Sequence, residues 1–286
     1  MSTPSRNFFR SILLAASIAV AGAPLLGNSA QAQGDRGAMP GDFDYYVLAL
    51  SWSPTYCDGR GGSGGDGERG NYDRRSDEDN YRDNDRNDDR RGYNRRRGDG
   101  EEQCTGTRPY SFVLHGLWPQ YERKGWPEMC RTNERPWVPE ETIDRMMDIM
   151  PSRRLVIQEY KKHGTCTGLD PRQYFDTART AFSGIRIPEE FRDLSQPLSV
   201  TPESIQKAFL AANPQLRPDM IQVVCSRQLL RELRVCFSKD LTPRSCSQNE
   251  QNRRLCTWDT VTLPPVRGGG TGPRGGPSYG RDGGRL

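Results

Sequence analysis

The stretch Ser111–Pro119, which reads SFVLHGLWP, joins a β-forming run to one of the two histidines in the chain. The run Phe112–Leu114 consists of aromatic, β-branched and aliphatic residues that favour a strand. Gly116 and Pro119 are residues that interrupt strands. We therefore expect a strand that ends near His115 and presents the imidazole at its end.

Similar patterns predict the other elements. The predicted strands are Tyr45–Leu50, Ile221–Cys225 and Leu233–Phe237, and the predicted helices are Glu140–Met150, Ser152–Lys162, Pro171–Phe182 and one that begins near Thr201. At Thr201 a capping residue precedes proline at the first helical position. Helices that cluster between strands without regular alternation predict an α+β fold, with a central antiparallel β-sheet flanked by helices.

The first 32 residues are typical of a signal peptide. Arg6 and Arg10 precede an apolar run over residues 12–26, and a small-x-small site, AQA, ends at Ala32. We expect cleavage after Ala32 and a periplasmic or secreted protein. Later segments have no apolar run long enough to span a bilayer, so the mature chain is expected not to bind membranes.

Export decides how the cysteines are interpreted. The chain has eight, at Cys57, Cys104, Cys130, Cys166, Cys225, Cys236, Cys246 and Cys256. An even number in an oxidising compartment predicts disulfides, although about a hundred pairings are possible. CxxC pairs do not occur and the histidines lack zinc-ligand spacing, so we expect no metal and no cofactor. The order of the last four suggests a nested pair, Cys225–Cys256 outside Cys236–Cys246.

Two segments are predicted to be disordered. Residues 58–103 hold 14 acidic and 11 arginine residues with almost nothing apolar, too little to offset the entropy of ordering. Residues 266–286 form a Gly/Arg-rich tail. Residues 40–265 without the insertion comprise about 180 residues, which is the size of one domain. The insertion is interpreted as a solvating loop, because its acidic residues offset its arginines. The tail has no such offset, and its arginines either bind nucleic-acid phosphates weakly or have no binding role.

His163 lies at the end of a predicted helix, and Gly164 is expected to cap that helix. Residues three and four apart share a helix face, so Glu159 should lie beside both Lys162 and His163, with Gln158 over Lys162. By itself this pattern fits an ordinary solvated helix equally well. Cleavage of RNA without a metal, however, needs a base, an acid and a cation at the phosphate, and two histidines with a lysine supply these groups.

The sequence resembles the ribonuclease T2 family. The resemblance rests on Phe112–Pro119, on Lys162–Cys166 (KHGTC) and on the lead-in Phe43–Cys57, and it extends from about Phe43 to Trp258. It implies an α+β fold with disulfides Cys57–Cys104, Cys130–Cys166, Cys225–Cys256 and Cys236–Cys246. It also implies cleavage of single-stranded RNA, not DNA, to 2′,3′-cyclic phosphate and then 3′-phosphate ends. His163 would be the base and His115 the acid, assisted by Lys162 and Glu159, in a protein that is expected to be a monomer.

Departures from the family pattern concern substrate binding. Gln158 stands where the family commonly has an auxiliary histidine; its amide can donate a hydrogen bond but carries no charge, so weaker binding or a lower rate is expected. Trp118 is a candidate for base stacking and equally a candidate for the core. Gln120 replaces an acidic base reader of some relatives, so we expect low base specificity.

Two other functions are weighed against the nuclease. One is a catalytically impaired relative that binds RNA or a protein through its arginine-rich segments; His115, His163 and Lys162 argue against it because all three are retained. The other is an exported metal-binding or redox protein, which free thiols would support.

Overall fold

The computed structural model describes residues 34–58, 102–106, 108–123, 125–133, 135–251 and 255–266. All of them belong to one compact unit that begins at Ala32. The expected signal peptide, the charged insertion apart from its ends, and the Gly/Arg-rich tail apart from its first residue lie outside these ranges. Within the ranges, the helices are too short or too polar to cross a bilayer.

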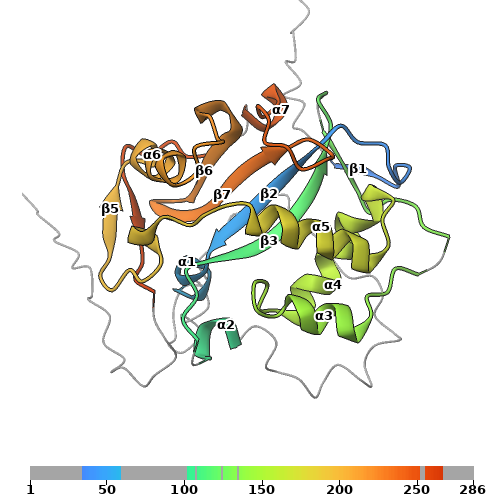
Figure 1. Cartoon of the computed structure of the whole chain (residues 1–286), viewed down its shortest axis with the longest axis horizontal. Coiled ribbons are helices and arrows are strands. Elements are labelled where there is room, and N and C mark those ends of the chain that lie inside the picture. The colour runs from blue at the N-terminus through green and yellow to red at the C-terminus, as the bar shows by residue number, and fades with distance from the viewer. Residues whose placement is uncertain are drawn as a thin grey trace, which may run out of the picture. The chain divides into compact units, whose positions relative to one another are not determined.

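A six-stranded sheet forms the centre of this unit. The described residues form eight strands, six in this sheet and two in a separate pair. They are β1 (Gly34–Arg36), β2 (Tyr45–Trp52), β3 (Phe112–Gln120), β4 (Trp126–Glu128), β5 (Leu198–Val200), β6 (Ile221–Ser226), β7 (Leu229–Phe237) and β8 (Val261–Leu263). The sheet order is β3-β2-β7-β8-β5, with β6 also paired to β7, and β1 pairs with β4 separately. Figure 1 shows β3, β2 and β7 as the long neighbouring strands.

The expectation of a central antiparallel sheet holds for most of the strand pairs but not for all of them. The pairs β2–β3, β2–β7, β6–β7 and β5–β8 are antiparallel. Leu229 of β7, however, pairs with Thr262 of β8 in parallel. The sheet is therefore mixed, because β8 returns beside β7 after a long connection rather than through a hairpin.

The described helices comprise the four that were predicted, one of them shorter than expected, and three short ones that were not predicted. They are α1 (Ser53–Asp58), α2 (Glu102–Thr105), α3 (Glu140–Met146), α4 (Arg153–Lys162), α5 (Pro171–Ser183), α6 (Pro202–Ala212) and α7 (Gln248–Gln251), with 3₁₀ turns η2 (Gly164–Thr167), η3 (Glu189–Phe191) and η4 (Pro218–Met220). Ser152, Asp170 and Thr201 accept hydrogen bonds from the first turns of α4, α5 and α6 as N-caps.

Helix α3 ends four residues before the predicted limit of Met150. The carbonyl of Ile149 accepts a hydrogen bond from the Leu114 amide of β3, at 2.8 Å. Pro151 also disfavours helical geometry in the residue before it. The segment after Met146 is therefore bound to the sheet edge instead of extending the helix.

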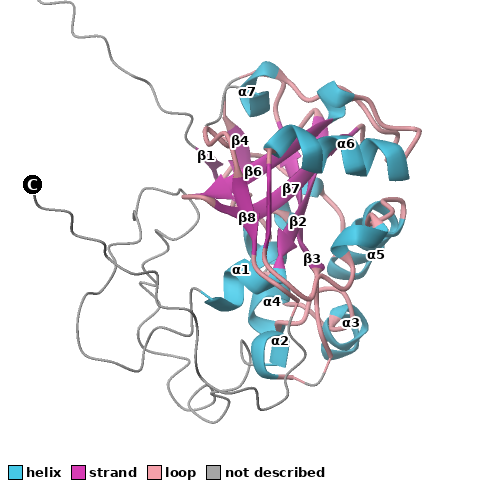
Figure 2. Ribbon diagram, turned by 90° about the vertical axis from the view of Figure 1, so that its left-hand side faces the viewer, coloured by secondary structure: helices cyan, strands magenta, loops and turns pink. Residues whose placement is uncertain are grey.

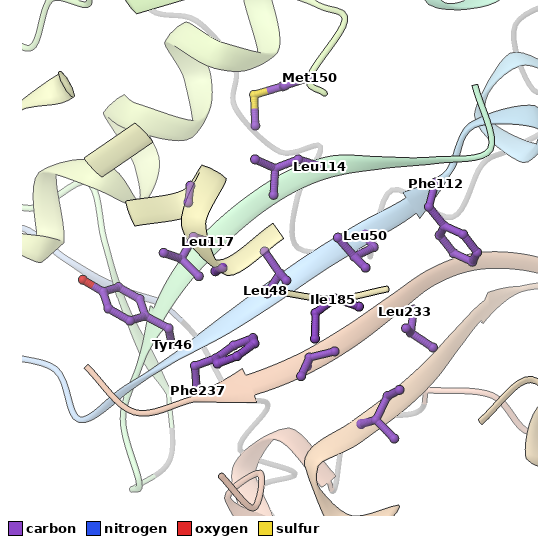
Figure 3. Packing of buried hydrophobic residues seen from close by; sticks show 14 of the residues in the cluster. Tyr46, Leu48, Leu50, Phe112, Leu114, Leu117, Met150, Ile185, Leu233 and Phe237 are labelled. Carbon is purple, nitrogen blue, oxygen red and sulfur yellow. The ribbon is translucent and has the colours of Figure 1, made fainter. Parts of the chain in front are cut away.

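Alternation along β2 divides the core between the two faces of the sheet. Tyr46, Leu48 and Leu50 belong to the main apolar cluster, together with side chains of α3, α4, α5 and α6; Figure 3 shows them packed beside Leu114 and Leu117. Figure 2 shows α3, α5 and α6 along one side of the sheet. Each leucine buried completely contributes roughly 1.5–3 kcal/mol. This face is therefore the main source of apolar stabilisation.

The opposite face carries a smaller cluster and buried charges. Tyr45, Val47 and Ala49 of β2 lie there with Trp118, Cys236 and Cys246. Glu232 and Arg234 of β7 are also buried, at 1% and 5% exposure. Charged side chains are almost never buried unless they are paired, and such groups often mark functional sites. This face is therefore the candidate location of the site.

All four disulfides implied by the family resemblance are present, and no free cysteine remains. They are Cys57–Cys104, Cys130–Cys166, Cys225–Cys256 and Cys236–Cys246, with Cα–Cα distances of 4.9–5.3 Å. The first links the two ends of the charged insertion. A protein that used these cysteines as metal ligands or redox thiols is therefore not supported.

Candidate active site

A β-bulge in β3 positions His115. Gly116 pairs with Ala49 and Leu114 with Leu50, so β3 has one more residue than β2 at this point, and that residue is His115. Bulges of this kind redirect a side chain and are common beside active sites. The side chain of His115 is 20% exposed.

The expectation that Gly116 and Pro119 stop the strand was wrong, because β3 continues to Gln120. β3 is the edge strand of its sheet, where the missing N–H of proline costs no ladder hydrogen bond. His115 therefore lies within the strand and not at its end.

His163 lies at the C-cap of α4, and its amide donates to the Glu159 carbonyl at 2.9 Å. The predicted cap at Gly164 was wrong, because this residue begins η2 and it is Gly168 that adopts the left-handed conformation, with φ 77°. Gly164 has a different reason to be glycine: a Cβ there would lie 2.3 Å from the Tyr160 ring. The chain thus turns tightly beside His163, which is 5% exposed.

The indole of Trp118 contacts both histidines. Its ring centre is 5.1 Å from that of His115 and 5.4 Å from that of His163. The two imidazoles are therefore separated by no more than the sum of these distances. Trp118 is itself 3% exposed, and the Arg234 guanidinium lies 4.9 Å from its ring centre. This burial favours the core alternative for Trp118 over base stacking.

Glu159 connects α4 to β3. Its Oε2 accepts a hydrogen bond from the Trp118 indole at 2.8 Å, and its Oε1 lies 3.7 Å from His115 Nε2. Gly116 makes this approach possible, since a Cβ at that position would lie 2.0 Å from Glu159 Oε2. No local pattern marked Gly116 as a site residue. Glycine is required at this position only because α4 packs against β3.

Lys162 is held by β4. Its Nζ lies 3.9 Å from Oε2 of the buried Glu128, and its carbonyl accepts a hydrogen bond from the Met129 amide at 2.8 Å. Glu128 also accepts from Arg36 of β1 at 2.9 Å. The lysine is therefore anchored at the end of α4 while its side chain stays 25% exposed.

The remaining residues predicted to bind substrate are more dispersed. Gln158 is exposed on α4. Gln120 is 1% exposed at the end of β3, and its side-chain oxygen has no hydrogen-bond partner within the described residues. The geometry therefore leaves Gln158 accessible to an RNA strand and Gln120 enclosed.

Sequence reasoning missed a buried carboxylate beneath His115. Glu232 Oε1 lies 2.8 Å from His115 Nδ1. Burial alone would raise the pKa of this carboxyl, but Arg234, then Arg231 and the hydrogen bond with His115, outweigh burial and hold the pKa well below its ordinary value. One signal was available: in β7, LLRELRVCF, Glu232 and Arg234 share a face with Cys236.

Comparisons with known proteins identify the family of the chain. The model of the ribonuclease T2 family matches residues 43–246. A ribonuclease of Aeromonas hydrophila is 31% identical over 258 residues, covering 86% of this chain and 94% of that protein. A probable ribonuclease of Haemophilus influenzae is 26% identical, covering 71% and 61%.

Among solved structures, an RNase-related protein from Calystegia sepium has the same fold, with a TM-score of 0.51 at 18% identity. It covers 79% of this chain and 98% of its own. With a family match that spans the bulged strand, α4 and most of the sheet, the chain belongs to the ribonuclease T2 family.

Proposed function

We propose that this chain is an exported endoribonuclease that cleaves single-stranded RNA without a metal ion, with His163 as general base and His115 as general acid. One observation carries the proposal: both imidazoles lie against the indole of Trp118. Two proton-transfer groups held this close can serve one phosphodiester from two sides. The Aeromonas hydrophila and Haemophilus influenzae relatives, a ribonuclease and a probable ribonuclease, support this substrate class.

The proposed reaction has two steps. His163 takes the proton of the 2′-hydroxyl, the 2′-oxygen bonds to phosphorus, and the bond from phosphorus to the 5′-oxygen breaks as His115 protonates that oxygen. The products are a 2′,3′-cyclic phosphate and a 5′-hydroxyl. Water then attacks the cyclic phosphate more slowly, with the two histidines in exchanged roles, and leaves a 3′-phosphate. Imidazole suits both roles because its ordinary pKa, ~6.5, populates both proton states near neutrality.

Lys162 and Glu159 complete the proposed machinery. A fixed ammonium stabilises the negative charge that develops on the phosphoryl oxygens, and Glu128 with the Met129 amide keeps Lys162 beside His163. Glu159 Oε1, 3.7 Å from His115 Nε2, is placed to hold the imidazolium before substrate binds. Gln158 is proposed to donate its amide to a phosphate, and a broad base preference is expected because Trp118 and Gln120 are both buried.

Purified protein tests the proposal with an RNA oligonucleotide and its 2′-deoxy counterpart, both in EDTA. We expect cleavage of the RNA alone, with cyclic phosphate ends. Replacing either His115 or His163 by alanine should lower kcat by about 10²- to 10⁴-fold. Lys162→Ala should also lower kcat, whereas the matched control Lys161→Ala should not.

Two results would contradict the proposal. Cleavage that EDTA abolishes and a divalent metal restores would replace the histidine mechanism by a metal-dependent one. Binding of RNA without cleavage would support the catalytically impaired alternative. For export, we expect the N-terminus of the protein recovered outside the cytoplasm to be Gln33, and a retained leader would contradict this expectation.

A further inference from the structure

A carboxylate buried in the sheet contacts one ring nitrogen of His115, and Glu159 lies near the other. Glu232 of β7 is 1% exposed, and its Oε1 lies 2.8 Å from His115 Nδ1. The strand between them, β2, has Ala49 paired with both Gly116 and Arg234. Because alanine is small, the bulged histidine can reach across β2 to β7.

The carboxylate is in turn fixed by arginine. Arg234 donates to Glu232 Oε2 through Nε at 3.1 Å and through Nη2 at 3.0 Å. Its Nη1 donates to Glu250 of α7 at 2.7 Å. Arg231 Nε lies 3.5 Å from Glu232 Oε1. Glu232 is therefore held in one geometry by contacts that do not involve substrate, which is how a reactive group is kept pre-organised.

We infer that Glu232 is a positioning residue for His115, an inference that rests on the proposed function. The carboxylate holds the single proton of the neutral imidazole on Nδ1 and leaves Nε2 directed toward Glu159 and the substrate. When the ring is protonated, the proton on Nε2 is the one transferred to the departing 5′-oxygen. Glu232 accepts the hydrogen bond throughout and takes no proton, so Nδ1–H stays fixed while Nε2 gains and loses its proton.

Carboxylates and cations both surround this ring. The charged and titratable groups that surround it are Glu159 and His163 from α4, Glu232, Arg231 and Arg234 from β7, and Glu250 through Arg234 from α7. The two carboxylates closest to the ring lie at different nitrogens, Glu232 at Nδ1 and Glu159 at Nε2. A nearby carboxylate favours the protonated form of an imidazole, so loss of Glu232 should lower the titration midpoint of His115.

Nuclear magnetic resonance of ¹⁵N-labelled imidazoles tests this directly, because the chain has only two histidines. The spectrum of His163→Ala assigns the His115 signals. In the wild-type protein above the titration midpoint, we expect His115 as the Nδ1–H tautomer. In Glu232→Gln we expect the midpoint to fall by about one pH unit or more. Observation of the Nε2–H tautomer in the wild type would overturn the inference without any variant.

Kinetics provide the second readout. Glu232→Gln should lower kcat by about 10- to 1,000-fold, part of what a positioned general acid contributes. Its affinity for the uncleavable 2′-deoxy oligonucleotide should change less than about twofold. The matched control is Glu250→Gln, which removes an equally buried partner of Arg234 but no contact of the His115 ring, and should leave the His115 tautomer as in wild type.

The outcomes separate this inference from the proposed function. A wild-type protein that does not cleave RNA contradicts the proposed function. A wild-type protein that cleaves, with a Glu232→Gln variant of unchanged kcat and unchanged His115 titration, contradicts only the positioning role. If Glu232→Gln does not fold, the inference is tested by the wild-type tautomer and by the variant Glu232→Asp. The shortened carboxylate of this variant should still favour the Nδ1–H tautomer. Its kcat should lie between those of wild type and His115→Ala.

Discussion

Replacement of Gly116 by alanine is the sharpest test of how the site is packed. The new Cβ would lie 2.0 Å from Glu159 Oε2 and 2.5 Å from Trp118 Nε1. These two atoms form the 2.8 Å hydrogen bond that joins α4 to β3. A methyl group cannot occupy this space unless the carboxylate or the indole moves, so the substitution should break the bond.

The magnitude follows from two costs. Loss of a hydrogen bond to a charged group costs about 1.5–3 kcal/mol, and forcing a methyl group into a filled site costs about 1–3 kcal/mol. Because the two costs partly overlap, we expect Gly116→Ala to lower the free energy of unfolding by about 2–5 kcal/mol. Displacement of Glu159 from His115 should also lower kcat for RNA.

The assay is urea unfolding with the disulfides intact, and Gly184→Ala is the control. At Gly184, φ is −73° and a Cβ would approach nothing closer than the Ala181 carbonyl, at 3.4 Å. This glycine-to-alanine change should therefore be neutral or stabilise by up to about 1 kcal/mol. An unfolding free energy for Gly116→Ala within ~0.5 kcal/mol of wild type would show that Glu159 and Trp118 do not fill the space beside this backbone.

Three further predictions concern the charges of the site. Gln158→His should raise kcat/KM, because an imidazolium above Lys162 adds positive charge at the phosphate; an unchanged ratio would argue against a role for this position. Glu232 has a pKa well below its ordinary value in the folded protein, so its ionised form contributes stability above the unfolded pKa of about 4.3, and this contribution is lost as the pH falls through the lower folded value. The difference in unfolding free energy between wild type and Glu232→Gln should therefore shrink on acidification, and a difference independent of pH would refute the pKa assignment. Deletion of residues 267–286 should weaken the salt dependence of KM if the arginines there recruit RNA; identical salt slopes would remove that role.

Local signals predicted much of the fold because each depends on residues only a few positions apart. The β-forming run at Tyr45–Leu50 is part of β2, the helix expected from Ser152 is α4, and the cap expected at Thr201 begins α6. Where such signals failed, a distant contact intervened. α3 ends early because Ile149 bonds to β3, and β3 passes through Pro119 because it is an edge strand.

The sequence by itself determined the family resemblance, the pairs of cysteines implied by that resemblance, and the side chains that we propose as acid, base and cation: His115, His163 and Lys162. Only the tertiary structure decided what surrounds them. His115 and Glu232 are 117 positions apart, and the need for glycine at Gly116 exists only once Glu159 lies against it. The identity of a titratable side chain is a local property, whereas its orientation and charge state depend on burial and on partners that the folded chain brings within a few ångströms.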